Sequence, residues 1–304
     1  MASGSPLFPR EPMAPIAVDD IPEGEEWGYQ LKWDGVRILA LVEHGKVTLM
    51  SRKLLDKTAL YPEITACLRS GFQQRLLLDG EVIYFDPEQG RPVFQKVLQR
   101  ERSRVAAAQS PRLTYVLFDL LIEGEEDLRT LPYEQRHARL QELMAKQPGL
   151  LLSELFRDGP RLWEWAQERG WEGIVIKRLS APYREGKKHK DWLKKKIALT
   201  VQASSPGIIL REGRVASLVV LGEDDAYIGR VSLGLTEPLR RQLLSFAQQH
   251  PGPPRWSPSP AAGRKEQIQW LSLPLQLTVT FLEWSQDGMM RHPKLLHLEG
   301  LEPE

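Results

Sequence analysis

The sequence predicts an α+β fold in two parts, a larger mixed domain followed by a small all-β barrel of the OB type. Up to about residue 200, apolar stretches typical of buried strands alternate with stretches of helical periodicity. Beyond that point, short strand-like stretches with tight turns surround one helical stretch, the pattern of a small Greek-key barrel. A chain of 304 residues also fits two domains of ~150 residues each. We expect a flexible lead-in at 1–20, the larger domain at 21–199 and the barrel at 200–304.

The larger domain is expected to begin with two strands within residues 27–50, joined by a His44-Gly45 turn, because residues of high strand propensity flank that dipeptide. The stretch 76–86 predicts a strand, a turn at Asp79-Gly80 and a second strand. Helical spacing predicts helices at 58–70, 91–108, 132–146 and 159–170. Apolar runs predict buried strands at 112–124 and 171–179, followed by the stretch DWLKKKIALTVQA.

The barrel domain is expected to open with short strands between residues 207 and 235, where glycines and charged pairs interrupt apolar runs. A helix is predicted at 236–249 and a proline-rich loop at 251–263. Strands return from residue 268. Five or so short strands and one helix fill a small closed barrel.

Composition excludes several classes of protein. The formal net charge is +1, so any surface for nucleic acid must be local. Cys67 is the only cysteine, which excludes disulfides within the chain and zinc sites built from several cysteines. The N-terminal residues lack the apolar core of a signal peptide, and no apolar run approaches the roughly 20 residues of a membrane span. We therefore expect a cytoplasmic protein.

The stretch KWDGVR places Lys32 in a cluster of charged residues between apolar runs. Taken alone, a lysine beside a strand is most often a solvated surface residue. Here Asp34-Gly35 lets the chain turn sharply, and Arg37 adds a second cation. Neighbouring cations and burial favour the free amine, so Lys32 is also a candidate nucleophile.

Two carboxylates occur in similar frames, Glu81 in DGEV and Glu172 in EGIV. Each lies beside a glycine and an apolar strand, and one interpretation is that both are turn residues at strand ends. The alternative is a pair of oxygen ligands for Mg²⁺, which commonly binds one or two carboxylates together with substrate phosphates.

A cationic run and an aromatic residue complete the candidate site. Residues 187–196 contain six lysines and one aspartate, and such runs are usually solvated. Lys194 and Lys196 would share one face of a strand, where two inward lysines need anionic partners such as a triphosphate. Phe118 in VLFDLL is either plain core or a platform on which a base stacks.

Together these pieces stand in the order found in the covalent nucleotidyltransferases. KWDGVR, SRK, LLLDGEVI, YVLFDLL, EGIVIKR and WLKKKI resemble six successive motifs of that superfamily, which comprises ATP-dependent DNA ligases, RNA ligases and mRNA capping enzymes. YREGKKHKDWLKKK, IGRVSLGL and FLEWSQDGMMRHPKLL further resemble bacterial end-joining DNA ligases. The resemblance covers roughly residues 15–300 and implies an adenylation domain followed by an OB-fold domain.

The resemblance implies that Lys32 attacks the α-phosphorus of ATP, expels pyrophosphate and carries AMP as a phosphoramidate. Mg²⁺ or Mn²⁺ held by Glu172 and Glu81 would neutralise charge in this step. The other positions follow the family pattern: Gln30 and Phe118 at adenine, Lys177 along the same pocket, Lys194 and Lys196 at the α-phosphate, Glu81 also at the ribose, and Arg291 at pyrophosphate.

The resemblance also implies a DNA substrate. AMP would pass to the 5′-phosphate of a break, and a 3′-hydroxyl would then seal the strand. Arg37 and Arg52 are the predicted phosphate-binding arginines, since the planar guanidinium pairs with two phosphate oxygens. The barrel is expected to rotate between steps about a hinge at 198–207. Candidates for duplex phosphates, with solvated surface as the alternative for each, are Arg100, Arg102, Arg104, Arg211 and Arg214.

Partners are implied only by the family. They are nicked or broken duplex DNA and the end-binding protein Ku of bacteria, for which no docking motif is evident. We expect a monomer that associates with the nucleoid.

Two positions depart from the family pattern. Gln30 stands where relatives often have glutamate, and its amide can accept a hydrogen bond from adenine or, turned over, accommodate guanine. Leu54 replaces the glycine of S-R-x-G. The alternatives to a DNA ligase are an RNA ligase or capping-type nucleotidyltransferase, and a nucleic-acid-binding module with an inactive pocket.

Overall fold

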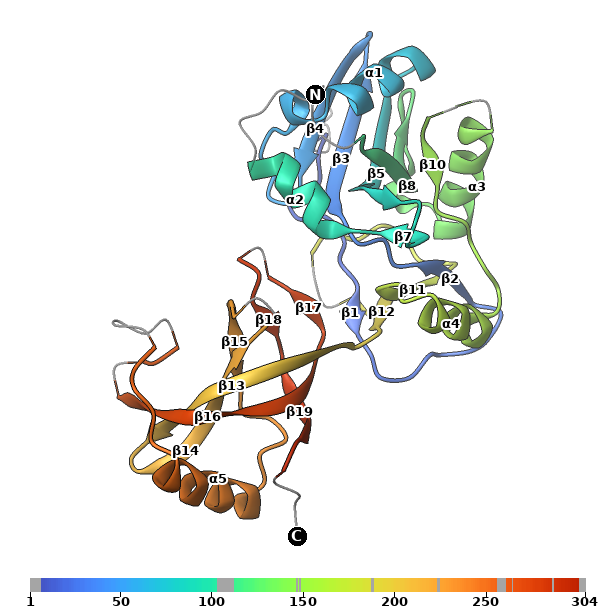
Figure 1. Cartoon of the computed structure of the whole chain (residues 1–304). Helices are drawn as coiled ribbons and strands as arrows, with labels where there is room; N and C mark the ends of the chain where they lie inside the picture. Colours follow the sequence, from blue (N-terminus) through green and yellow to red (C-terminus); the bar gives the residue numbers. More distant parts are fainter. Residues whose placement is uncertain are drawn as a thin grey trace. The chain divides into compact units, whose positions relative to one another are not determined.

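The computed structural model describes residues 7–102, 112–145, 147, 149–186, 189–222, 225–255, 261–263, 265–285 and 287–300. The chain forms two compact units, unit 1 at Met1–Ile197 and unit 2 at Ala198–Glu304, and each is described by itself (Figure 1). No helix among these residues has the length and apolarity to cross a membrane.

Unit 1 contains a six-stranded sheet with the order β10-β8-β5-β3-β4, in which β9 also pairs with β8. Helices α1, α2 and α3 contribute Leu68, Val97 and Leu140 to a core on one face of this sheet. The opposite face carries Leu39 and Leu77, which pack with residues of a second sheet. The elements are β3 (Val36–Glu43), β4 (Lys46–Ser51), η1 (Thr58–Leu60), α1 (Pro62–Gly71), β5 (Leu76–Ile83), β6 (Phe85–Asp86), β7 (Arg91–Pro92), α2 (Phe94–Arg102), β8 (Thr114–Glu123), β9 (Glu126–Asp127), η3 (Leu128–Thr130), α3 (Tyr133–Met144) and β10 (Leu151–Leu152).

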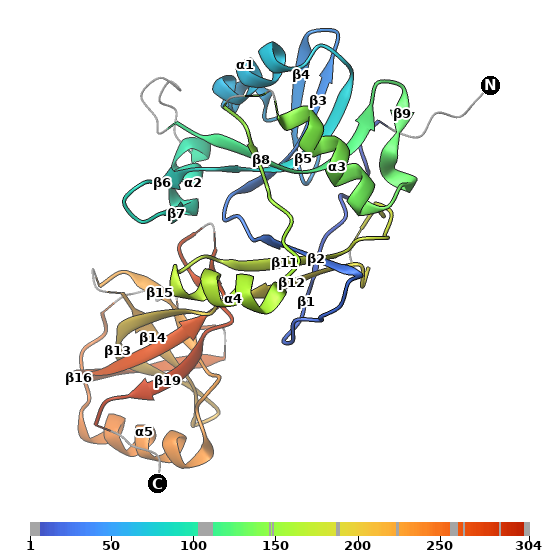
Figure 2. The same cartoon turned by 90° about the vertical axis from the view of Figure 1, so that its right-hand side faces the viewer.

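The second sheet of unit 1 has four strands in the order β1-β12-β11-β2. They are β1 (Ile16–Ala17), β2 (Trp27–Leu31), β11 (Gly173–Arg178) and β12 (Trp192–Lys196). Helix α4 (Gly159–Glu168) covers this sheet (Figure 2). Leu162 and Ala166 of α4 pack with Tyr29 and Ile176 of the sheet. A Cβ at Gly159 would stand 2.3 Å from the Tyr29 ring, so glycine lets the helix approach closely.

Unit 2 is a curled antiparallel sheet in the order β15-β14-β13-β16-β19. Leu233 pairs with Lys294 in an isolated bridge, which links the chain after β15 to β19 at the opposite edge. The predicted OB-type barrel is therefore confirmed. Its elements are β13 (Leu199–Arg211), β14 (Arg214–Leu221), β15 (Tyr227–Val231), α5 (Glu237–Gln249), β16 (Glu266–Phe281), β17 (Glu283–Trp284), β18 (Met290–Arg291) and β19 (Lys294–Leu298).

Three local predictions were wrong. The first strand is not continuous: β2 and β3 belong to different sheets, and residues 32–35 join them. Asp79-Gly80 is not a turn, because β5 runs through both residues. A Cβ at Gly80 would stand 2.4 Å from the carbonyl oxygen of Val116, so this glycine serves close strand packing.

The third concerns residues 13–18, which are not a flexible lead-in. Met13 is fully buried, and Ile16 and Ala17 pair with Leu193 and Lys194 of β12. The segment predicted as a hinge, 198–207, lies mostly in β13, whose residues 199–205 pair with β16. The helix predicted at 91–108 begins only at Phe94, and its part from 103 onward falls outside the described residues.

Candidate active site

Lys32 lies in the connection that carries the chain from one sheet of unit 1 to the other. β2 ends at Leu31 and β3 begins at Val36. The backbone N–H of Lys32 donates to the carbonyl of Gly173 at 2.9 Å. At Gly35, an added Cβ would stand 2.2 Å from the carbonyl oxygen of Val82. These close backbone approaches fix the point from which the Lys32 side chain extends.

Strands β11 and β12 supply the other charged residues through their register. Gly173 pairs with Lys196, so Glu172, one residue earlier, comes beside Lys196. Gly173 has φ 138°, and a Cβ there would stand 2.1 Å from the carbonyl oxygen of Lys195, so glycine is required at this crossing. Lys194 shares a face of β12 with Lys196.

Glu172 holds two lysines at once, and we call Lys32, Glu172 and Lys196 the ion-paired cluster. Its Oε2 accepts from Lys32 Nζ at 2.5 Å, and its Oε1 lies 2.8 Å from Lys196 Nζ. Burial lowers the pKa of Lys32, but attraction to Glu172, Glu81 and Asp34 outweighs burial, and the pKa is raised. Burial raises the pKa of Glu172, but the two lysines leave that pKa lowered. Lys32 is therefore an ammonium group in this ion-paired state.

Glu81 is the second carboxylate that acts on Lys32. Burial raises its pKa to about 8, Lys32 and Arg37 lower it in part, and Glu172 raises it further. Glu81 is half-buried, and a carboxyl with so high a pKa lacks a full counter-charge, which a divalent cation would supply. Within the described residues there is no group of three or more His, Cys, Asp or Glu suited to a metal. Two carboxylates suffice for Mg²⁺ where phosphates supply further ligands.

Lys177, at the other end of β11, is enclosed by aromatic rings. Its Nζ lies 4.1 Å from the ring centroid of Trp192, 4.2 Å from that of Tyr133 and 4.7 Å from that of Phe118. It also donates to the Tyr133 hydroxyl at 3.1 Å. Burial lowers the pKa of Lys177 to about 7, although two buried aspartates attract the cation. We call these four residues the aromatic cluster.

Gln30, on β2, has a fixed amide orientation. Its Nε2 donates to the carbonyl of Ser153 at 2.8 Å, and a backbone carbonyl can only accept. Nε2 of His137 lies 2.9 Å from the same carbonyl. The Tyr133 hydroxyl donates to the carbonyl of Phe118 at 2.9 Å. The bond to Ser153 turns the Gln30 nitrogen toward a backbone carbonyl and leaves the amide oxygen as the acceptor end of the side chain.

Arg37 is held within unit 1. Its Nε and Nη2 donate to the two oxygens of Asp79 at 2.9 and 2.6 Å, and its Nη1 donates to the carbonyl of Met13 at 2.7 Å. The Tyr183 hydroxyl donates to the same aspartate at 2.9 Å. In this structure a buried ion pair therefore replaces the predicted phosphate contact. The sequence interpretation missed Asp79, although a charge inside the apolar run LLLDG signalled that a buried partner was needed.

The other predicted arginines differ in exposure. Arg52 is exposed just after β4, and Arg291 belongs to unit 2, where it lies 3.5 Å from Glu283. Arg100 is buried and donates to Glu63 at 2.7 Å, so its prediction as a duplex contact was wrong. Of the remaining duplex candidates, Arg102, Arg211 and Arg214 are exposed, and Arg104 falls outside the described residues.

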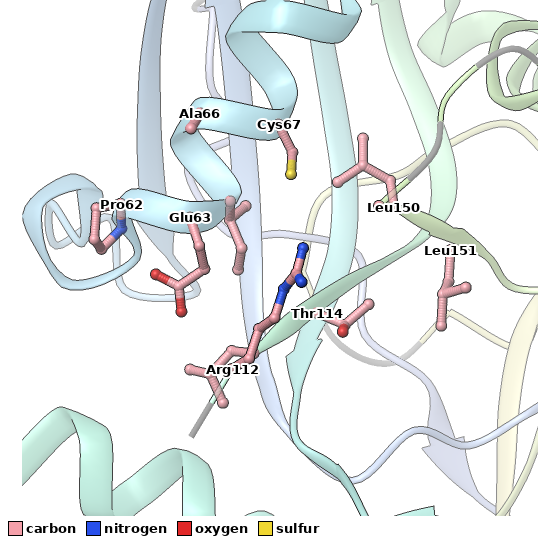
Figure 3. A pocket seen from close by; sticks show the side chains of 11 residues that line it. Pro62, Glu63, Ala66, Cys67, Arg112, Thr114, Leu150 and Leu151 are labelled. Atoms are coloured by element: carbon pink, nitrogen blue, oxygen red, sulfur yellow. The ribbon is translucent and has the colours of Figure 1, made fainter. Parts of the chain in front are cut away.

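Figure 3 shows a pocket formed by α1, the start of β8 and residues 149–151. Its lining includes Cys67, Glu63 and Arg112. None of the predicted site residues lines it, so it is separate from the two clusters around β11 and β12.

Comparison with known proteins follows this geometry. Residues 16–196 match the ATP-dependent DNA ligase domain. The multifunctional non-homologous end joining protein LigD of Pseudomonas aeruginosa is 31% identical over 289 residues, which are 90% of this chain and 33% of that protein. A probable DNA ligase of Anaeromyxobacter dehalogenans strain 2CP-1 is 35% identical over 75% of this chain and 47% of its own length. The chain thus spans between a third and a half of these relatives.

Solved structures of DNA ligase D are also similar to this chain. The ligase domain of Mycobacterium tuberculosis LigD is 27% identical, with a TM-score of 0.57 over 97% of this chain and 98% of that one. A mycobacterial DNA ligase D complexed with ATP and MES has the same identity and TM-score over 95% of this chain and 94% of that chain. The match over residues 16–196 covers more than half of the sequence, and this chain belongs to the ATP-dependent DNA ligase domain family.

Proposed function

We propose that this chain seals 5′-phosphate/3′-hydroxyl breaks in duplex DNA through a lysine–AMP intermediate formed at Lys32. The observation that carries the proposal is the ion-paired cluster, in which Glu172 binds Lys32 on one oxygen and Lys196 on the other. The Glu172 carboxylate thereby holds a nucleophilic amine close to a second cation that can bind phosphate.

The first step needs Lys32 as the free amine. In the ion-paired cluster its pKa is raised, so Lys32 must release its proton before it attacks. Mg²⁺ or Mn²⁺ held by Glu81 and Glu172 would offset the negative charge of these carboxylates, which favours the ammonium form of Lys32. The cation would also offset the charge of the triphosphate. Lys32 Nζ, having given its proton to solvent, forms a bond to the α-phosphorus. The bond from that phosphorus to the bridging oxygen breaks and pyrophosphate leaves, while Lys194 and Lys196 hold the α-phosphate.

The aromatic cluster is the proposed adenine site, with Phe118 as the stacking surface. The contacts of Gln30 support ATP over GTP. Its amide oxygen matches the amino group at position 6 of adenine, whereas guanine carries an acceptor oxygen at that position. The bond to Ser153 holds the amide in this orientation, so the amide cannot turn over without losing that hydrogen bond.

The later steps transfer AMP to the 5′-phosphate and release it when the 3′-hydroxyl attacks. Exposed Arg52 is the better candidate for the 5′-phosphate, because Arg37 is committed to Asp79. We assign Arg291 of unit 2 to pyrophosphate in the first step. Because several relatives are end-joining proteins, we further propose that the substrate is a double-strand break, that Ku is the partner and that the chain acts as a monomer at the nucleoid.

The test is intact-mass analysis after incubation with ATP or GTP and a divalent cation. Wild-type protein should gain one AMP from ATP, and Lys32→Ala should gain none. Lys195→Ala is the matched control, because Lys195 lies in the same lysine run but stacks on Trp163. A wild-type protein that remains unlabelled contradicts the proposal.

Substrate choice is then read from sealing. Nicked DNA should be sealed in preference to nicked RNA, and blunt ends should be joined better when Ku is added. Preferential labelling by GTP would favour a capping-type enzyme, and preferential sealing of RNA would favour an RNA ligase.

A further inference from the structure

The turn that follows β4 exposes two leucines. Residues Leu54 and Leu55 are 37% and 59% exposed, and Leu55 is the most exposed large apolar residue in the part of the chain that the structure describes. Arg52 and Lys53 precede them and are exposed as well. We call residues 52–55 the 52–55 tip.

The tip is held in one conformation. Leu54 N–H donates to the carbonyl of Ser51 at 2.8 Å, and Ser51 N–H donates to the carbonyl of Leu55 at 2.9 Å. The Ser51 hydroxyl accepts from Leu55 N–H at 3.2 Å. The two leucines are therefore presented by a closed, hydrogen-bonded turn.

Leu54 adopts a left-handed backbone conformation, with φ 57°. Glycine adopts this conformation without steric cost, whereas the Cβ of leucine makes it sterically costly. Of the five non-glycine residues with positive φ in the described part of the chain, the other four are polar: His44, Glu212, Asp225 and His292. Leu54 therefore carries backbone strain although its side chain is exposed, and strained positions of this kind cluster at functional sites.

The strand register places the 52–55 tip at the end of the six-stranded sheet where the chain enters β3 from Lys32. Ser51 pairs with Ile38, so the residues after Ser51 continue toward Val36, where β3 begins. Residues 32–35 lead into that same end of β3. The other edge strand of this sheet is β10.

We propose that Leu54 and Leu55 form an apolar wedge that packs against the bases at the DNA break while Arg52 and Lys53 bind the flanking phosphates. The inference rests on the proposed DNA-sealing function. Apolar side chains inserted at a base step are a known mode of DNA binding, and neighbouring cations bind the backbone. No ion pair between described residues engages either Arg52 or Lys53. Two leucines are also far too few for a protein interface, which needs about 800 Å² on each partner.

The experiment separates the DNA steps from the first step. Leu55→Ser and Leu54→Gly are assayed for lysine–AMP formation without DNA and for sealing of a nicked duplex that already carries the 5′-adenylate. We expect adenylation within about twofold of wild type, and a loss of about tenfold or more in affinity for the nicked duplex and in sealing. Leu54→Gly should also raise the Tm by about 2–4 °C, because it relieves the strain at φ 57°.

Leu151→Ser is the matched control. Leu151 is 43% exposed on β10, the opposite edge strand of the same sheet, and it lines the pocket of Figure 3. Its sealing should equal that of wild type. Wild-type sealing by both tip variants overturns the proposal, as does a defect that occurs only when a protein partner such as Ku is present. Failure of the proposed function would show separately, as a wild-type protein that forms no lysine–AMP.

Discussion

The ion-paired cluster and the aromatic cluster stand at opposite ends of the same two strands. The register of β11 and β12 pairs Gly173 with Lys196 at one end and Lys177 with Trp192 at the other. Each cluster contains a lysine that is mostly withdrawn from solvent. The pKa of Lys32 is raised, whereas burial lowers the pKa of Lys177 to about 7.

The difference lies in what surrounds each amine. Lys32 touches a carboxylate directly, and that attraction outweighs the cost of burial. Around Lys177 stand three aromatic rings and the neutral Tyr133 hydroxyl, and the buried carboxylates of Asp79 and Asp119 are bound to Arg37 and Arg136. A carboxylate that is paired elsewhere attracts a lysine less. One end of the strands therefore keeps its lysine charged in an ion pair, whereas burial among aromatic rings at the other end favours the neutral amine.

The largest expected effect concerns the structural carboxylate beneath the aromatic cluster. Asp119 and Arg136 are both fully buried and joined by two hydrogen bonds of 2.8 and 2.9 Å. Asp119→Asn leaves the guanidinium without its counter-charge, so we expect the free energy of unfolding to fall by about 3–5 kcal/mol. Urea unfolding measures it. The control is Glu126→Gln, which removes an exposed partner of Arg139 and should change stability by less than ~1 kcal/mol. Equal losses in the two variants would contradict a buried, structural role.

Replacing Glu172 should affect catalysis, whereas replacing Asp119 should affect stability. Glu172→Gln removes the charge shared by Lys32 and Lys196, and we expect lysine–AMP formation to slow by about 10²–10³-fold. Because Glu172 raises the pKa of Lys32, its loss lowers that pKa. The remaining activity should then reach its free-amine plateau at lower pH than wild type. Single-turnover adenylation across pH tests both expectations, with exposed Glu164→Gln on α4 as control. An unchanged pH profile would show that Glu172 does not control the Lys32 proton.

The sequence predicted the fold class because helical periodicity, apolar strands and turn residues are local signals. The six motifs also predicted one site that contains Lys32, Glu172, Lys177 and Lys196, and the structure brings three of these, Lys32, Glu172 and Lys196, into contact. What local signals could not show was where the chain changes sheets. Residues 27–50 have strand propensity throughout, and only the tertiary structure separates β2 from β3 at residues 32–35.

Non-local pairing explains the other misses. Asp79 looked like a turn residue because Asp-Gly favours turns, yet Arg37 binds it from the neighbouring strand. The pKa of Lys177 depends on rings from β8, α3 and β12, which no spacing in the sequence brings together. Gln30 is similar, since its amide orientation is set by Ser153, which lies 123 positions away.

The smallest expected effect is the pH dependence that Lys177 gives to stability. In the unfolded chain a lysine keeps its proton up to about pH 10.5, whereas the folded protein releases it near pH 7. Folding therefore expels a proton between these values, and the contribution of Lys177 to stability falls as pH falls from 10.5 to 7 and then stays constant. Lys177→Met has no proton to lose, so its stability lacks this slope.

The measurement is the difference in unfolding free energy between Lys177→Met and wild type at several pH values. It should shrink by about 1–2 kcal/mol between pH 7 and pH 8.5, at 1.36 kcal/mol for each unit of pH. Taking the difference cancels the titration of distant groups such as Glu81, whose raised pKa gives a slope of the opposite sign. Lys195→Met should show no such trend. A difference that stays constant from pH 7 to 10 would mean that Lys177 remains charged among its three rings. Lys177 and Lys32 would then differ in their surroundings but not in their protonation.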